Sequence, residues 1–170
     1  MFPLRRPKTV ILLMVVFAWS LTMAVDLLVH GPTTADQILY DELGLGWLGA
    51  SLIGMIAVLD LGAVSYLVKP APVGIFICLS SIALSALQNS LGFFLAHTYP
   101  EVARRAVVMA TQLKGVTMSA ESIDAVMDPN LWLLTWSGSL VISLALVVLV
   151  RRNVGWFLGQ PVAAGLGEHG

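Results

Sequence analysis

The chain has 170 residues, of which 58% are hydrophobic and only 11% are charged. A soluble domain has roughly a quarter charged residues, so this composition argues against a soluble domain and for an integral membrane protein. The formal net charge is −1 and no long basic patch is present, which argues against nucleic acid as a partner. The single cysteine, Cys78, excludes an internal disulfide and a Cys-x-x-Cys redox pair.

Four stretches approach or exceed the roughly 20 apolar residues that a helix needs to cross a bilayer. We predict spans over residues 9–29, 46–68, 73–97 and 131–150. The predicted fold class is therefore all-α and integral to the membrane, a bundle of four transmembrane helices that forms one domain over residues 1–158. The glycine-rich remainder, residues 159–170, is predicted to be a flexible tail.

The first span follows a short basic leader that contains Arg5, Arg6 and Lys8. This pattern is also typical of a secretory signal, with the residues Thr-Met-Ala at 22–24 as its cleavage region. The apolar run continues beyond that region to Val29, so we favour an uncleaved span. Cleavage would leave three spans and would place the new N-terminus outside.

The loop after the first span is predicted to contain a short amphipathic helix over residues 34–43. Gly31 and Pro32 end the span before it. Thr34 and Gln37 have the spacing of a capping box. We expect this helix to lie at the membrane interface or over the mouth of the bundle.

The second span has a face of small residues at spacings of four, of the kind that lets helices approach closely in lipid. This face consists of Gly46, Ala50 and Gly54, followed by Ala57. Asp60 lies further along, within reach of the same face. The turn at residues 69–72 is too short to hold a domain, so the second and third spans must be antiparallel neighbours.

The third span contains no charged residue but carries a stripe of polar and small side chains. Its members are Ser81, Ser85, Gln88, Asn89 and Gly92. Because they step by three and four residues, they share one side of a helix. Polar amides are costly in hydrocarbon unless they are paired, so we expect the stripe to face protein or enclosed water.

The longest loop is predicted to hold two amphipathic helices within residues 101–127. The apolar face expected to be buried in the first helix is Val102, Ala106, Met109 and Leu113. Gly115 ends that helix, and Ser119 caps the second. Asp128 and Pro129 then suit the N-cap and the first residue of the fourth span.

The basic residues predict the orientation of the chain in the membrane. Six lie on one side of the predicted spans: Arg5, Arg6, Lys8, Lys69, Arg151 and Arg152. Three lie on the other side, in the longest loop: Arg104, Arg105 and Lys114. Since the basic side is usually cytoplasmic, we place both termini in the cytoplasm, both amphipathic loops outside, and the protein in a cell inner membrane.

The rise of about 1.5 Å per helical residue predicts two polar layers within the membrane. The layer nearer the outer face comprises Asp26, Gln88, Asn89 and Thr135. The deeper layer places Asp60 near the level of Ser80, Ser81 and Ser143. Intramembrane carboxylates are often functional, which suggests a proton or cation path or a small polar ligand site. Alternatively, these groups satisfy one another and set the register of the helices.

Tryptophans mark the predicted ends of the spans. Trp47, Trp132, Trp136 and Trp156 suit the interfacial belt of a membrane protein. Trp19 is near mid-span and is interpreted as a packing residue.

No phosphate-binding loop, nucleophile elbow or zinc motif occurs in the sequence, so we predict no enzyme, cofactor or metal. The leading hypothesis is a non-enzymatic accessory or interaction subunit that binds a membrane-protein partner or a second copy of itself. An alternative is an oligomeric small transporter or channel component that uses Asp60 with Gln88 and Asn89. A third hypothesis is a haem-binding membrane protein, since His30 and His97 both end spans on the predicted outer side.

Overall fold

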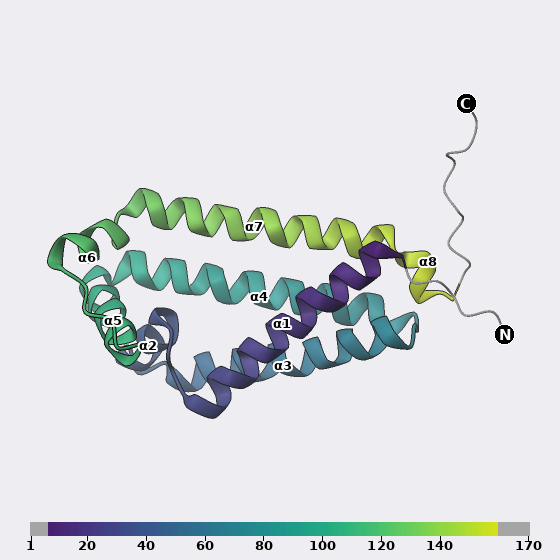
Figure 1. The fold of residues 1–170 in the computed structure, drawn as a ribbon, viewed down its shortest axis with the longest axis horizontal. Helices are drawn as coiled ribbons and strands as arrows, with labels where there is room; N and C mark the ends of the chain where they lie inside the picture. Colours follow the sequence, from purple (N-terminus) through teal and green to yellow (C-terminus); the bar gives the residue numbers. More distant parts are fainter. Residues whose placement is uncertain (1–6, 160–170) are drawn as a thin grey trace.

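The computed structural model describes residues 7–159. Within this range the chain is helical and has no strand, and four helices are long and apolar enough to cross a membrane. These helices are α1 (Lys8–His30), α3 (Gly46–Val68), α4 (Val73–Thr98) and α7 (Pro129–Arg152) (Figure 1). The predicted all-α class and the four apolar spans are therefore confirmed. The predicted tail lies outside the described residues except for Gly159.

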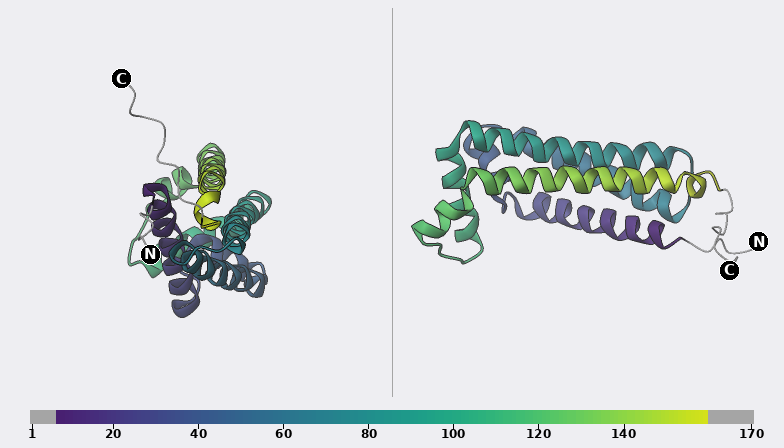
Figure 2. Two further views of the ribbon diagram at one scale, coloured as in Figure 1. Left: turned by 90° about the vertical axis from the view of Figure 1, so that its right-hand side faces the viewer. Right: turned by 90° about the horizontal axis from the view of Figure 1, so that it is seen from above.

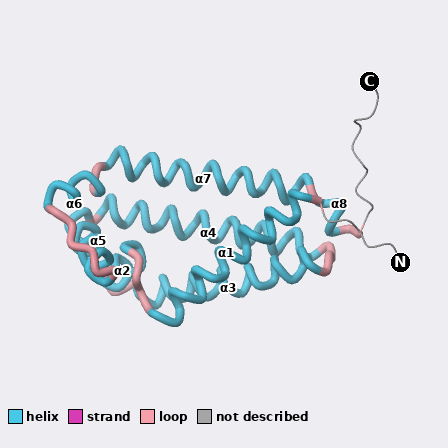
Figure 3. Tube along the Cα trace, viewed as in Figure 1, coloured by secondary structure: helices cyan, strands magenta, loops and turns pink. Residues whose placement is uncertain are grey.

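The four long helices run along the molecule, and the short helices lie at its two ends (Figures 1 and 3). One end, which we call the cap end, carries α2 (Ala35–Glu42), α5 (Pro100–Leu113) and α6 (Ala120–Val126). The other, which we call the terminal end, carries α8 (Val154–Phe157) and the two ends of the described chain.

The long helices pack as a chain of neighbours: α1 against α3, α3 against α4, and α4 against α7. The contact of α3 with α4 is the one that the short turn between them requires. Contact between α1 and α7 is sparser, and α1 diverges from α7 toward the cap end (Figures 1 and 2). The group of long helices is therefore less closed at the cap end than at the terminal end.

The largest apolar core lies at the terminal end. Its buried members are Val10, Leu13, Phe17, Ala63, Leu67, Cys78, Ile82, Val150, Trp156 and Phe157. The sequence did not predict α8, and Trp156 was expected in the interfacial belt. Instead α8 folds back onto the bundle, Trp156 is only 4% exposed, and its Nε1 donates to the Leu67 carbonyl at 3.3 Å. Burying two large aromatic side chains offsets the cost of ordering this short segment.

A second apolar cluster holds the cap end together. Helix α2 contacts α3, α4 and α5, so it is enclosed by other helices. Helix α5 buries only part of the face that its sequence predicted: Ala106 is fully buried and Val102 packs against the cluster, whereas Met109 is 37% exposed and Leu113 is 65% exposed. The buried residues of α5 are Ala103, Ala106, Val107 and Ala110. The reason is steric: alanines allow the α5 backbone to approach α2 and Ala96 closely, whereas the longer side chains remain outside.

Local signals explain where several helices begin and end. The Ser119 hydroxyl accepts from the Ser122 N–H, and Asp128 accepts from the Asn130 N–H at 2.8 Å, as the sequence predicted for both N-caps. Thr34 is the N-cap residue of α2, but its side chain makes no capping hydrogen bond. The predicted capping box is therefore wrong, because Gln37 is buried toward Gly49 of α3 instead of reaching back to Thr34.

Candidate functional site

Asp60 is the most deeply buried charged residue of the described chain, with no solvent exposure. It lies on α3 where α1, α3 and α4 meet. The Ser81 hydroxyl of α4 donates to Asp60 Oδ1, and Ser20 of α1 lies close to the same carboxyl group. The second oxygen, Oδ2, is buried without a hydrogen-bond partner. The deeper of the two predicted polar layers thus gathers a carboxyl group and two hydroxyls.

Ser20 was not among the predicted site residues, and its place follows from the packing of α1. Phe17 and Ala24 are buried on α1, and Ser20 follows the first by three residues and precedes the second by four. It therefore lies on the buried side of the helix. That side could be recognised only once the packing of α1 was known, because the whole helix is apolar.

The polar stripe of α4 meets different partners along its length. Ser81 pairs with Asp60 of α3, whereas Gly92 lies against the Asp36 side chain of α2: a Cβ at Gly92 would be 3.5 Å from Asp36 Cγ. Ser85 and Gln88 are half-buried between these points. Asn89 is accessible and faces a cleft between α4 and α7.

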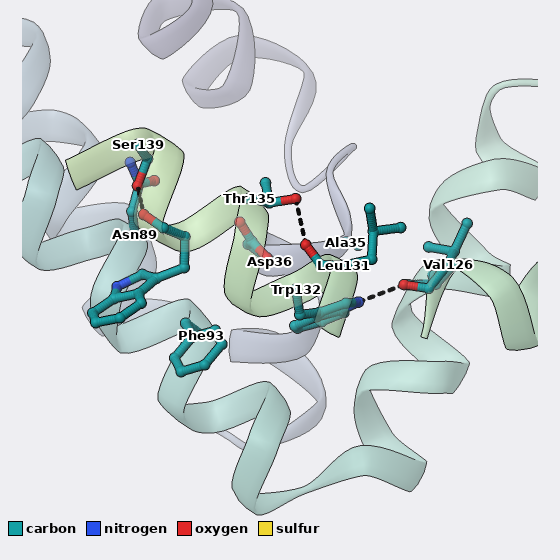
Figure 4. Close-up of a pocket in the computed structure, with 11 residues that line it drawn as sticks. Ala35, Asp36, Asn89, Phe93, Val126, Leu131, Trp132, Thr135 and Ser139 are labelled. Carbon is teal, nitrogen blue, oxygen red and sulfur yellow. Dashed lines mark hydrogen bonds between the residues drawn. The ribbon is translucent and has the colours of Figure 1, made fainter. Parts of the chain in front are cut away.

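This α4–α7 cleft has a volume of about 500 Å³ and is lined partly by residues of the cap helices α2, α5 and α6; Figure 4 shows its lining residues. Its polar lining residues are Asp36, Asn89, Thr135 and Ser139. Its aromatic lining residues are Phe93, Trp132 and Trp136. Short apolar side chains from α2, α5, α6 and α7 complete it, and no residue of α1 or α3 lines it. The cleft is therefore built by α4, α7 and the cap helices.

The hydrogen-bond donors that surround the cleft are largely used within the protein. The hydroxyls of Thr135 and Ser139 donate to carbonyls of their own helix, to Leu131 at 2.8 Å and to Trp136 at 2.7 Å. The indole N–H of Trp132 donates to the Val126 carbonyl at 2.6 Å (Figure 4), and that of Trp136 donates to Ser90 Oγ at 3.1 Å. A hydroxyl whose proton is engaged can still accept through its oxygen. Apart from the Asn89 amide, whose Nδ2 can still donate, the polar groups that line the cleft are therefore available as acceptors.

Asp36 has no hydrogen bond or ion pair with any residue between 7 and 159. Its side chain is accessible from the cleft, and the surrounding helices displace water from its other sides. This partial desolvation raises the pKa of Asp36 above its usual value of 3.8. The pKa of the nearby Tyr40 is also raised, first by burial and then by the negative charge of Asp36.

The cations of the cap end do not compensate this charge. Arg104 pairs with Asp124 at 2.6 Å, and Arg105 approaches Glu42 at 3.4 Å. Asp36 was not a predicted site residue. Only the packing of α2 under α5 and against α4 brings this loop carboxylate to the cleft, so no local pattern in the sequence could reveal it.

Asn89 and Thr135, two members of the predicted outer layer, line the same cleft, whereas Asp26 does not. Asp26 Oδ1 lies 2.9 Å from Nδ1 of His30 on an exposed side of α1. Asp26 stands four residues before His30, which is the spacing at which two side chains meet on a helix surface. The carboxylate of the outer layer is therefore paired locally and does not reach the other helices.

His97 has different surroundings from His30. Its ring stacks on Phe93 at a centroid distance of 6.2 Å, and Phe93 in turn stacks on Trp136 at 5.0 Å. In the described part of the chain no three metal-ligating side chains come together. Haem ligation by His30 and His97 stays a prediction, which the absorbance spectrum of the purified protein would check.

The small residues predicted to form one face of the second span have different surroundings: Ala57 is buried in a cluster with Ala24 of α1, whereas the others do not contact the long helices in the same way. Ala50 is exposed, a Cβ added at Gly54 would meet no heavy atom within 4 Å, and Gly46 lies against Asp41 of α2. Close contacts are also made by Gly49, which faces Gln37 and Tyr40, and by Gly74 of α4. Close approach thus occurs at Gly46, which the spacing pattern named, and at glycines that it did not name.

Comparisons with protein-family models, with curated proteins and with solved structures find no match.

Proposed function

We propose that this protein is a non-enzymatic accessory or interaction subunit of a membrane, and that it works by binding an occupant in the α4–α7 cleft. The observation that supports this function is the set of unpaired acceptors in that cleft, at the level where the apolar spans end. Polar groups facing hydrocarbon are costly, so an occupied cleft is more stable than one open to lipid chains. The occupant is a partner molecule or part of a second copy.

The charge distribution supports an orientation for this function. The basic residues Lys8, Lys69, Arg151 and Arg152 lie at the terminal end, and Arg5 and Arg6 precede Lys8 in the sequence. Eight of the ten acidic residues belong to the cap end. We therefore propose a four-helix bundle in a cell inner membrane, with both termini in the cytoplasm and the cap helices outside. The cleft then lies toward the outer side.

Site-specific photo-crosslinking in native membranes tests the proposed function. A photoreactive amino acid at Leu131, which lines the cleft, is expected to form a discrete adduct. The matched control is Leu134 of the same helix, which is 69% exposed and does not line the cleft. Adducts of equal yield at both positions, or at neither, would contradict a binding function for the cleft.

A small oligomeric transporter or channel component is the second candidate, because Asp60 keeps one buried oxygen unpaired. If ions or protons pass along Asp60 with Gln88 and Asn89, Asp60→Asn should abolish flux into proteoliposomes. Asp26→Asn, which changes an exposed carboxylate, is the control and should keep the flux. Equal flux in the wild type and Asp60→Asn would count against transport.

A further inference from the structure

We propose that the occupant of the α4–α7 cleft is the primary ammonium headgroup of a membrane lipid. This goes deeper into the proposed function and rests on it, because it names what the same cleft binds. The contacts of Asp36, Asn89, Thr135 and Ser139 carry the inference.

The hydrogen-bonding character of the cleft selects a ligand rich in donors. Asp36 accepts through its carboxylate, and Asn89 can accept through its amide oxygen. The hydroxyl oxygens of Thr135 and Ser139 accept as well, since their protons already bind backbone carbonyls. A primary ammonium group has three N–H donors and no acceptor, so it complements this lining. A quaternary ammonium group has no N–H donor and would leave the acceptors unpaired, which is costly.

The charge of the cleft also selects a cation. Eight acidic residues lie at the cap end, in a chain with ten in total, against three of its nine basic residues. Two of those three, Arg104 and Arg105, face Asp124 and Glu42, and Asp36 has no basic partner in the part of the chain that the structure describes. A cation from outside the chain would therefore meet an uncompensated carboxylate.

The rest of the lining selects a lipid over a free amine. Phe93 and Trp136 stack face to face at an interplanar angle of 16°, and together with Trp132 they give the cleft a broad aromatic wall. Such a wall suits the glycerol and acyl region of a lipid at the end of a membrane span. The volume of about 500 Å³ is within the range of ligand-binding clefts. Because the phosphate links the ethanolamine to the glycerol, it would lie at the cleft mouth, between the ammonium bound by the acceptors and the acyl chains on the aromatic wall.

Native mass spectrometry of the purified full chain tests this proposal. The detergent-solubilised protein is equilibrated with an equimolar mixture of phosphatidylethanolamine and phosphatidylcholine that carry the same acyl chains. We expect the wild type to retain the ethanolamine lipid about tenfold more, since a charge-assisted hydrogen bond supplies a preference of this order. Asp36→Asn should bring the ratio close to one.

Two further variants make the result specific to the cleft. Glu121→Gln removes a negative charge from the exposed surface of α6 and should keep the wild-type preference. Thr135→Val keeps the shape of the side chain but removes one acceptor, so it should reduce the preference less than Asp36→Asn does. If Asp36→Asn fails to fold, the comparison of Thr135→Val with Glu121→Gln decides the question in its place.

The outcomes show whether the lipid assignment fails alone or together with the proposed binding function of the cleft. Equal binding of the two lipids by the wild type, or a preference that survives Asp36→Asn and Thr135→Val, overturns the lipid assignment. If the wild type shows no lipid preference but the Leu131 crosslink yields a protein adduct that depends on Asp36, the occupant is a basic side chain of a partner. In that case the lipid proposal fails and the proposed function stands. If neither the adduct nor the preference is found, both fail.

Discussion

At the scale of single residues, two glycines of the long helices differ in what an added methyl group would meet. A Cβ at Gly74 would lie 2.6 Å from Tyr66 Cβ and 2.9 Å from Phe157 Cδ1, whereas a Cβ at Gly54 would meet no atom within 4 Å. We expect Gly74→Ala to lower the free energy of unfolding by about 1–3 kcal/mol through overpacking. Gly54→Ala should not lower it. Thermal unfolding of both variants in detergent measures the difference, and equal losses would contradict the packing of α8 against α4.

The carboxyl group of Asp36 makes stability depend on pH. Its pKa is higher in the folded chain than its usual value of 3.8, because partial desolvation disfavours the charged form. The folded state then binds the proton more tightly than the unfolded state does. The stabilisation that this proton gives to the folded state is therefore full below pH 3.8, and it is lost as the pH rises through the raised pKa. In detergent free of amine lipids, Asp36→Asn should therefore flatten the fall in stability over this window. Unfolding curves that keep the wild-type dependence on pH would contradict this assignment.

At the scale of elements, the helix N-termini differ in how much their caps contribute. Asp128 accepts from the Asn130 N–H at the start of α7, whereas the Thr34 side chain makes no such bond at the start of α2. Asp128→Ala should cost about 0.5–2 kcal/mol of stability. Thr34→Ala is the matched control and should leave the stability nearly unchanged. Chemical unfolding in detergent compares the two, and a larger loss for Thr34→Ala would be inconsistent with the structure.

The elements also show why one helix face could be misassigned. Helix α5 has an apolar side that contains both alanines and longer residues, and its periodicity alone allows either to be buried. In the packed molecule Ala103, Ala106 and Ala110 are buried together with Val107, and the longer Met109 and Leu113 are exposed. In α1, Ser20 faces the core and Asp26 faces away, a distinction that an apolar helix does not display in its sequence.

At the scale of the whole molecule, the orientation in the membrane can be tested through cysteine labelling. The native Cys78 is fully buried, so the wild type should not react with a membrane-impermeant maleimide. Val116→Cys, at a residue that is 51% exposed in the loop after α5, should react in intact cells. Lys69→Cys, in the turn after α3, should react only after permeabilisation. Labelling of Lys69→Cys in intact cells would reverse the proposed topology.

The class of the protein and most of its local boundaries follow from the amino-acid sequence alone. The length and apolarity of the four spans set where helices lie, since backbone groups in hydrocarbon must be satisfied within the helix. The caps at Ser119 and Asp128 and the turn at Gly115, with a φ of 70°, are short-range effects that depend on neighbouring residues.

Which side chains meet, in contrast, is a property of the packed molecule. Packing brings Asp36 of a loop helix beside Asn89 and Thr135, pairs Asp60 with Ser81, and folds α8 onto the terminal end. These contacts join residues far apart in the chain, and they depend on helix rotation and on the sizes of facing side chains. A helix that is apolar on all sides carries no signal for its rotation, so the cleft exists only once the helices have packed.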